Sequence, residues 1–323
     1  MWMPATSGHD ESMAGAVGIR GLVHCRNATE AGDGGSGPAL QPHDRSRSLA
    51  IPDLTMLRPL QTIKFLAAWA VPWRPAFQTS AQSSRLKFFV SCRDVTGRHL
   101  AKYGAHEPEL TAWIAAHLRQ SPPGIVVDIG ANIGWHSVHA AKIDTVQTVV
   151  AFEPDAFNGW LLDRNLTANQ IDNVIVERQA VGARPGVARL HRYKASNNGR
   201  HSMIAAYGLG SSLVPVVALD DVLQDLDLAE RPISLIKIDV EGFEPCVIAG
   251  APRAIERASA IITEVSPELS RGGGLSVDDM VGQLLSAGFA PHRLQDDGTL
   301  QTIKVRDLVA ITGQLDVIWL RER

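Results

Sequence analysis

The chain has 323 residues, of which 45% are hydrophobic and 20% charged, which is enough for a packed core in one large domain or two small ones. Its formal net charge of −3 argues against a nucleic acid as its main partner. Its three cysteines, Cys25, Cys92 and Cys246, lack the spacing of a disulfide framework or a zinc site, and they predict a reducing, cytoplasmic environment. We expect neither a transmembrane segment nor a signal peptide.

The first part of the chain divides into a predicted leader and a predicted cap. Residues 1–50 are rich in Gly, Ser, Pro and Asp, a composition that predicts disorder. Residues 51–122 are expected to form an N-terminal cap of helices and a strand, which leaves 123–323 as the main domain. A helix near 60–70 is expected to pack on that domain, with a membrane surface or a partner as the alternative contact. A strand at 86–90 and a helix at 108–119 complete the cap.

In the main domain, predicted strands alternate with predicted helices. The strands are expected at 125–128, 148–153, 174–178, 234–239 and 260–265. The helices are expected at 133–142, 155–168, 220–226, 244–257 and 277–287. This alternation predicts βαβ units and a mostly parallel sheet. Two further strands at 186–193 and 214–219 flank a long polar loop, and a last strand at 316–320 is expected to be antiparallel at or near the sheet edge.

Four of the predicted strands end in or next to an acidic residue. These residues are Asp128, Glu153, Asp239 and Glu264. Because the carboxyl ends of parallel strands share one edge of a sheet, the four carboxylates are expected to converge on one crevice. One such acid could simply cap the next helix, but four of them indicate a shared ligand site.

The turn after the first of these strands discriminates between nucleotide ligands. It reads Asp128-Ile-Gly130-Ala-Asn-Ile-Gly134, with an acid where a dinucleotide site has its first glycine. A carboxylate there would repel a pyrophosphate but tolerates the cationic groups of S-adenosylmethionine (SAM). Glu153, at the end of the next strand, is suited to accept ribose hydroxyl groups. Its alternative role is to cap the helix that follows Pro154.

Five segments together resemble the FkbM-type class I SAM-dependent methyltransferases. They are VVDIGANIGWHS (126–137), AFEP (151–154), VVALDDVL (216–223), IKIDVEGFEPCVIAGA (236–251) and IITEVSP (261–267). The fourth segment is the most specific for this type. The resemblance runs from about residue 88 to 319, and the first eighty or so residues have no counterpart in it.

The resemblance implies a Rossmann-like, seven-stranded class I methyltransferase sheet, mostly parallel with a reversed last strand. It also implies SAM as the methyl donor. By position in the motifs, the cofactor-binding residues would be Asp128, Gly130, Ala131, Asn132, Gly134, Glu153, Pro154, Gln179, Ala180 and Asp239. Gln179 and Ala180 would border the adenine, and Asp239 would face the methyl group.

Methyl transfer to an oxygen requires a positioned acceptor and removal of its proton. The candidate catalytic residues are Asp239, Glu241 and His201, with Glu264 as a further base. Each has an alternative: Asp239 could hold the SAM amino group, Glu241 could cap the next helix, and His201 could be exposed in its loop. No His or Cys cluster has metal-binding spacing, so we expect no metal, with a divalent ion that joins Asp239 to another acid as the alternative.

These observations predict a SAM-dependent methyltransferase of EC class 2.1.1. Family members commonly methylate oxygen, so the expected acceptor is a hydroxyl on a sugar, a glycolipid or a polyketide-like small molecule. Two alternatives stay open. The chain could be a SAM-binding or scaffold protein without turnover, or an NAD-linked oxidoreductase, although the missing first glycine disfavours the latter.

Overall fold

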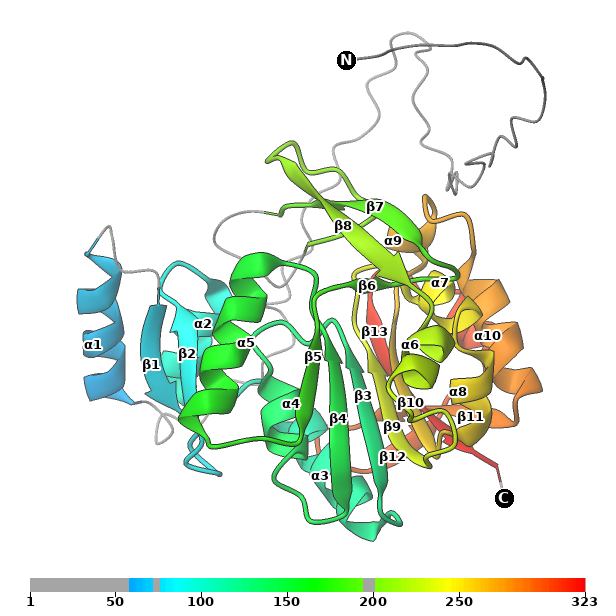
Figure 1. Cartoon of the computed structure of the whole chain (residues 1–323), viewed down its shortest axis with the longest axis horizontal. Helices are drawn as coiled ribbons and strands as arrows, with labels where there is room; N and C mark the ends of the chain where they lie inside the picture. Colours follow the sequence, from blue (N-terminus) through cyan, green and yellow to red (C-terminus); the bar gives the residue numbers. More distant parts are fainter. Residues whose placement is uncertain (1–57, 72–75, 194–200, 323) are drawn as a thin grey trace, which may run out of the picture.

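The computed structural model describes residues 58–71, 76–193 and 201–322. The predicted leader, residues 1–50, lies outside these ranges, and the boundaries of cap and main domain stay predictions. In the described ranges no helix combines the length and the apolar character needed to cross a membrane. One large sheet runs through the centre of the described chain, with a smaller N-terminal layer at one side (Figure 1).

The central sheet has eight strands in the order β12-β11-β13-β10-β9-β3-β4-β5 (Figure 1). The strands that pair in parallel are β3 (Gly124–Ile129), β4 (Val146–Phe152), β5 (Val174–Glu177), β9 (Ile233–Ile238) and β10 (Ala260–Val265). The antiparallel part consists of β11 (Phe289–Leu294), β12 (Leu300–Thr302) and β13 (Leu315–Arg321). The predicted Rossmann-like class I methyltransferase sheet with a reversed last strand is therefore confirmed, with β12 as an eighth strand at its edge.

The last strand, β13, is antiparallel as predicted and lies third from the sheet edge, between β10 and β11. The sequence pattern does not show β11, because Pro291 interrupts it and proline is disfavoured in strands. Trp319 of β13 is fully buried, and its indole Nε1 donates to Thr263 Oγ1 of β10 at 2.9 Å. Because β13 has a neighbouring strand on each side, the large Trp319 side chain is shielded from water.

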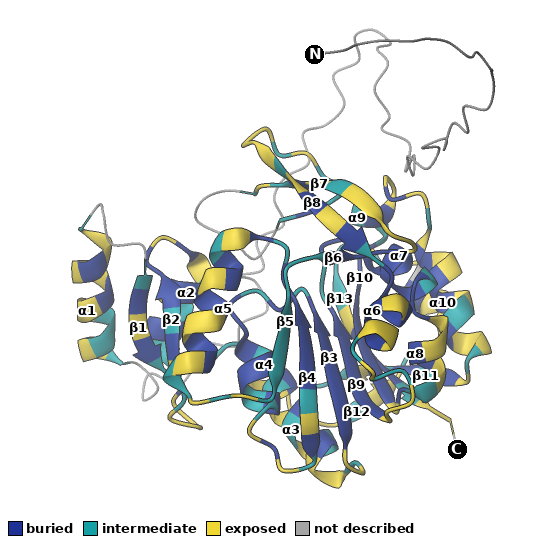
Figure 2. Ribbon diagram, viewed as in Figure 1, coloured by how far each residue is buried: buried dark blue, intermediate teal, exposed yellow. Residues whose placement is uncertain are grey.

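The central strands are apolar because helices cover both faces of the sheet. On β3, Ile125, Val127 and Ile129 belong to one hydrophobic cluster, whereas Val126 points into another. The first cluster includes α6 (Leu219–Asp225), α7 (Glu244–Ala249), α8 (Pro252–Arg257) and α10 (Val277–Ser286), and the second includes α3 (Pro108–Gln120) and α4 (Trp135–Ala140). Figure 2 shows β3 buried along its length, while the outer faces of the helices are exposed. The helix predicted at 244–257 is in fact two helices, α7 and α8, since Pro252 starts a new one.

The N-terminal layer is attached to the main sheet through α5 (Ala156–Ala168). It consists of α1 (Pro59–Trp69), β1 (Ala76–Ser80), β2 (Lys87–Ser91) and α2 (Val95–Tyr103). Asn165 of α5 accepts from Phe89 N–H and donates to the carbonyls of Phe89 and Ile133, and Asn169 pairs in the same way with Lys87. The two side-chain amides thus pair with the edge of β2 as another strand would.

A second, three-stranded sheet lies beyond the carboxyl ends of the central strands (Figure 1). It is formed by β6 (Ala180–Val181), β7 (Gly186–His191) and β8 (Ser211–Val217) in the order β6-β8-β7. Of the connection between β7 and β8, residues 192–193 and 201–210 are described. Two short helices, α9 (Pro267–Ser270) and α11 (Val305–Val309), complete the described elements.

Candidate active site

A cavity lies at the carboxyl ends of β3, β4 and β9, under the three-stranded sheet. Most of the predicted site residues line it: Gly130, Ala131, Asn132, Glu153, Pro154, Gln179, Ala180, His201 and Asp239. Four predicted residues, Asp128, Gly134, Glu241 and Glu264, are not part of its lining. Of the four acids expected to converge on one crevice, Glu153 and Asp239 line this cavity, whereas Asp128 and Glu264 do not.

The glycine turn after β3 is shaped by close backbone approach. Gly130 has a φ of 82°, and a Cβ atom there would collide with the carbonyl oxygen of Asp239. The N–H groups of Gly130 and Ala131 both donate to Phe152 O, at 3.0 and 2.9 Å, which ties the turn to β4. Gly134, with a φ of 81°, instead leaves room for the Leu162 side chain, so its role is packing rather than lining.

Glu153 is a buried carboxylate in the cavity wall. Its Oε2 accepts from Asn132 N–H at 2.7 Å and its Oε1 from Asp155 N–H at 2.8 Å. Asp155 caps α5 with its own side chain, so the alternative role considered for Glu153, capping that helix, is filled by another residue. Burial raises the pKa of Glu153 to about 7, although the two backbone N–H groups oppose this shift.

Asp128 lies beneath the turn instead of in the cavity wall. It is 2% exposed, and its Oδ2 accepts from Ser137 Oγ at 2.5 Å. Its Oδ1 is buried without a hydrogen-bond partner among the described residues. Its charge is matched by Lys237, whose pKa it helps to raise. The acid that distinguishes this turn from a dinucleotide turn therefore acts on the neighbouring strand, not directly on the cavity.

Lys237 of β9, which the sequence analysis did not single out, lines the cavity beside Asp239. Its Nζ lies 3.3 Å from Asp239 Oδ2. Burial alone would lower its pKa, but Asp239, Asp128 and Glu107 together hold it above its ordinary value. The two-residue spacing of Lys237 and Asp239, which puts both on one face of a strand, is the signal that could have revealed this pair.

The turn after β9 is held by Glu244 and not by Glu241. Glu244 Oε1 accepts from the N–H groups of Val240 and Gly242, at 3.0 and 3.3 Å. Burial raises the pKa of Glu244 to about 8. Glu241 has a left-handed φ of 51° and does not cap α7, so the alternative considered for it does not hold.

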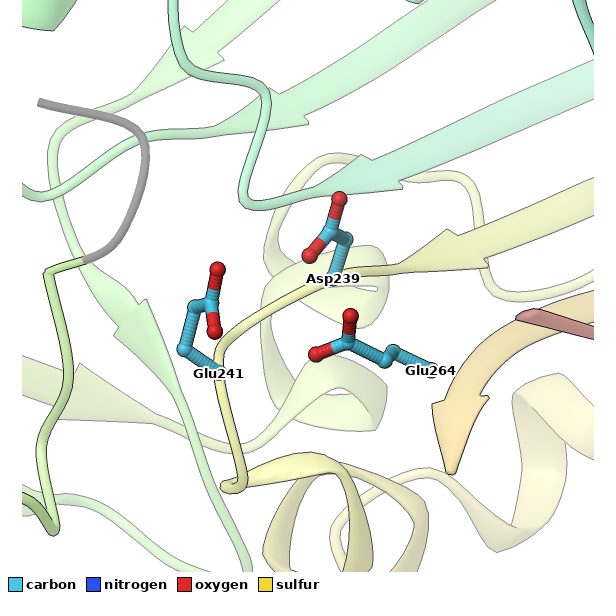
Figure 3. Close-up of side chains that lie close together, drawn as sticks. All are labelled: Asp239, Glu241 and Glu264. Atoms are coloured by element: carbon cyan, nitrogen blue, oxygen red, sulfur yellow. The ribbon is translucent and has the colours of Figure 1, made fainter. Parts of the chain in front are cut away.

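The carboxylates of Asp239, Glu241 and Glu264 point toward one another (Figure 3). One oxygen of each lies within 4.8 Å of the others. Gln314 Nε2 donates to Glu241 Oε2 at 3.0 Å and to Glu264 Oε2 at 2.8 Å. The Gln314 amide thus donates hydrogen bonds to two of the three carboxylates. We assign no metal to the cluster.

His201 lies in the cavity wall with 11% of its side chain exposed, so it is not the solvent-exposed histidine considered as its alternative. Its Nδ1 accepts from Tyr193 N–H at 3.2 Å, and its Nε2 lies 3.9 Å from Asp155 Oδ2. Since Nδ1 is the acceptor, a neutral ring carries its hydrogen on Nε2 and has no second basic nitrogen. This geometry suits His201 as a hydrogen-bond donor and not as a base.

Three more polar residues line the cavity: His106, Glu107 and His136. The first two precede the glycine turn in the sequence, and His136 follows it. Glu107 Oε2 lies 3.0 Å from His136 Nε2, and Glu107 Oε1 lies 3.6 Å from His106 Nε2. None of the three was predicted. His106 and Glu107 lie in a loop before α3 and therefore outside the strand-end pattern that revealed the other site residues.

Residues 128–291 match the methyltransferase FkbM domain, which is half of the chain. The chain belongs to the FkbM methyltransferase family. A hexuronic acid methyltransferase of Haloferax volcanii is 28% identical over 144 residues, which are 44% of this chain and 55% of that protein. The chain thus spans about half the length of this curated relative.

Solved structures similar to this FkbM-family chain are distant in sequence. An O-methyltransferase from Bacillus cereus in complex with SAH is 11% identical with a TM-score of 0.42, covering 84% of this chain and 94% of that one. The precorrin-6y C5,15-methyltransferase from Geobacter metallireducens is 13% identical with a TM-score of 0.37, covering 68% and 90%.

The FkbM match covers the glycine turn, Glu153 and the turn after β9, but it begins after His106 and Glu107. Those two residues come from the segment predicted as the N-terminal cap. The cavity of this FkbM-family protein is therefore completed by residues outside the matched domain.

Proposed function

We propose that this FkbM-family protein is a SAM-dependent O-methyltransferase that methylates a hydroxyl group of a sugar or glycoside. The observation that carries the proposal is the position of Glu153. Its carboxylate lies in the cavity wall beside the glycine turn, held by two backbone N–H groups, while Asp155 caps the following helix. A carboxylate held in this way is suited to accept the two hydroxyl groups of a ribose.

The other residues around the cavity fit SAM. At Gly130 the absence of a side chain keeps the turn against Asp239, and Gly130 to Asn132 would border the methionine part of the ligand. Gln179 and Ala180, which also line the cavity, would border the adenine. When bound, SAM supplies a methyl group on a positively charged sulfur. The cavity has carboxylates rather than an arginine-rich wall, which favours this cation over a phosphate-bearing dinucleotide.

The acceptor is proposed from two sources. The walls carry hydrogen-bonding side chains such as Thr96, His201 and Asp239, which suit a polyhydroxylated molecule. The relative from Haloferax volcanii is described as a hexuronic acid methyltransferase, which makes a uronic acid or a related glycoside the first acceptor to test. Cytoplasmic location and the absence of a nucleic-acid partner stay predictions.

The test starts with ligand binding. Calorimetric titration of the purified chain with SAM, S-adenosylhomocysteine and NAD should show binding of the first two only. Binding of NAD without SAM would reject the proposal in favour of an oxidoreductase. Labelled SAM is then incubated with methyl glucuronide and, as the neutral counterpart, methyl glucoside.

The expected product is a labelled methyl ether of at least one of these glycosides. Binding of SAM without transfer to either glycoside, or to a glycolipid extract, would favour the alternative of a SAM-binding protein without turnover. The position of the label on oxygen is read by NMR of the product. A labelled ester of the uronic acid carboxylate would contradict hydroxyl methylation.

A further inference from the structure

A carboxylate placed between two imidazoles faces the same cavity as Asp239. Glu107 Oε2 lies 3.0 Å from His136 Nε2, and Glu107 Oε1 lies 3.6 Å from His106 Nε2. The exposed fractions of the side chains are 30% for His106 and 11% for His136. The cluster is separate from the acidic group of Asp239, Glu241 and Glu264. The proposed function assigns it no role.

The backbone at Glu107 is bent in a way that serves this cluster. Glu107 has a left-handed φ of 45°, which is unfavourable for a residue with a side chain. It occupies the N-cap position of α3, yet its side chain makes no capping hydrogen bond there. A carboxylate at a helix N-terminus would ordinarily bond to the helix N–H groups. Here it is directed to the two histidines instead.

His106 is held in place from its other side. Thr111 Oγ1 donates to His106 O at 3.2 Å and in turn accepts from Trp135 Nε1 at 2.9 Å. The His106 ring meets the Trp135 ring edge-on, with ring centroids 6.2 Å apart. The ring is thus positioned by the helix that follows the glycine turn, and its orientation is coupled to the cofactor side of the cavity.

The two histidines differ in what they can do. His136 directs Nε2 to Glu107, and its Nδ1 is buried without a partner among the described residues. A buried nitrogen is not accessible to a substrate, so His136 is suited to hold Glu107. His106 directs Nε2 toward the same carboxylate, and in the described structure no hydrogen bond engages its Nδ1. In a neutral ring with hydrogen on Nε2, Nδ1 is the basic atom.

We propose that His106 is the general base of the methyl transfer and that Glu107 is the residue that positions it. The inference rests on the proposed function and deepens it. Asp239 is less suited to this role because it is already paired with Lys237, and Glu241 because it accepts from Gln314. His201 uses its Nδ1 to accept from Tyr193 N–H.

With His106 as the proton acceptor, every atom and charge of the methyl transfer is accounted for. The hydroxyl oxygen of the acceptor forms a bond to the methyl carbon, the carbon–sulfur bond breaks, and its electron pair stays on the sulfur of the departing S-adenosylhomocysteine. The hydroxyl proton moves to Nδ1 of His106. The imidazolium, stabilised by Glu107, then releases its proton to solvent.

The charges around His106 suit a base that is neutral near pH 7. Burial lowers its pKa, Glu107 and Asp239 oppose that effect, and His136 and Lys237 add to it. Glu107 itself stays ionised, because His106 and His136 hold its pKa well below the usual range although burial alone would raise it. A neutral imidazole beside a fixed carboxylate is the arrangement that general-base catalysis requires.

The experiment compares His106→Gln and Glu107→Gln with His292→Gln, a histidine of β11 outside the cavity. SAM binding, measured by calorimetry, should stay within about threefold of the wild type in all three, which shows that the cavity is folded. Methyl transfer to methyl glucuronide or methyl glucoside should fall by about a hundredfold or more in His106→Gln. The acidic limb of the pH–rate profile should disappear with it.

A second readout is independent of turnover. In an NMR pH titration of the histidine ring signals, the signal missing from His106→Gln identifies His106. Its pKa should move lower in Glu107→Gln, because the carboxylate that opposes the shift is gone. Full turnover in His106→Gln, or a His106 titration indifferent to Glu107, overturns this inference while leaving the proposed function intact. If the wild type transfers no methyl group, both the role of His106 and the proposed function are contradicted.

Discussion

Lys237, near the end of β9, and Asp239, two residues further along the chain, form an ion pair, with Nζ 3.3 Å from Oδ2. The lysine is 5% exposed, whereas a third of the Asp239 side chain is accessible. One member of the pair is therefore buried in the sheet, and the other is accessible from the cavity. The pair also balances Asp128, which lies beneath the glycine turn on the neighbouring strand.

Replacing Lys237 by methionine should destabilise the protein. The substitution leaves Asp128 and Asp239 without their shared cation, and the expected loss in unfolding free energy is about 2 kcal/mol, less than for a fully buried pair because water reaches Asp239. Urea unfolding measures the change. Lys87→Met, at an exposed position of β2, is the control and should stay within about 0.5 kcal/mol of the wild type. Equal stability of Lys237→Met and wild type would contradict the assigned pairing.

Gly130→Ala should weaken ligand binding, since its Cβ would collide with the backbone of Asp239. Gly298, in the turn between β11 and β12, has nearly the same φ, 80° against 82°, but a Cβ atom added there would meet no other atom within 4 Å. Gly298→Ala therefore carries the backbone strain alone, about 1 kcal/mol. SAM affinity should fall by more than about tenfold in Gly130→Ala only. A similar loss in both variants would show that global strain, not the local collision, is responsible.

SAM affinity should depend on the ionisation of Glu153. Burial raises the pKa of this carboxyl to about 7, with Asp155 adding to the shift and Arg178 opposing it. At pH 6 most of the carboxyl groups are protonated, and affinity should be roughly tenfold weaker than at pH 8. Calorimetric titrations at both pH values test this. Glu153→Gln should bind weakly at both and show no such difference, which separates the effect from titration of SAM itself.

Glu244 should make the protein less stable as the pH rises. Its folded-state pKa of about 8 lies above the ordinary value of 4.5, so between these values the folded state binds more protons than the unfolded state. The contribution is complete below pH 4.5 and is lost as the pH rises toward 8, at up to roughly 1.4 kcal/mol per pH unit. Unfolding of the wild type and Glu244→Gln is compared at pH 5.5 and 8. The variant should lose less stability over this interval; parallel behaviour would refute the assignment.

Asn165 should be essential for attaching the N-terminal layer. It is fully buried and bonds to both backbone groups of Phe89 and to Ile133 O. Asn165→Ala leaves these buried groups unsatisfied and should cost about 2–4 kcal/mol. Asn169→Ala, whose contacts to Lys87 are exposed, should cost less than about 1 kcal/mol. Hydrogen exchange at Phe89 N–H reports whether β2 separates from α5 before the rest unfolds.

Much of the fold could be predicted because its strands are buried on both faces. The apolar runs of β3, β9 and β10 and the acids that follow them stand out in the sequence. β11 did not, because Pro291 and the polar residues after it break the strand pattern, so the sequence did not show that β11 pairs with β13 on its outer side. The break between α7 and α8 was also missed, since the apolar spacing continues through it.

The candidate site divides in the same way. Residues that follow a strand directly, such as Gly130, Glu153 and Asp239, were predicted because parallel strands bring their carboxyl ends to one edge. Glu107 and His106 could not be predicted, since a loop before a helix has no such constraint. The alternative roles of Glu153, His201 and Glu241 were also undecided, because each depends on a hydrogen-bond partner far away in the chain or on a backbone angle.

The sequence by itself determined the α/β sheet, the glycine turn and the family, because these depend on patterns formed by residues close together in the chain. Only the tertiary structure decided which acids face the cavity and which lie beneath it. Asp128 is hidden under the turn, Asp239 is paired with Lys237, and Glu107 is held between two histidines. The reason is physical: a charged group's role is set by burial and by the charges and donors within a few ångströms of it, and those neighbours come from distant segments.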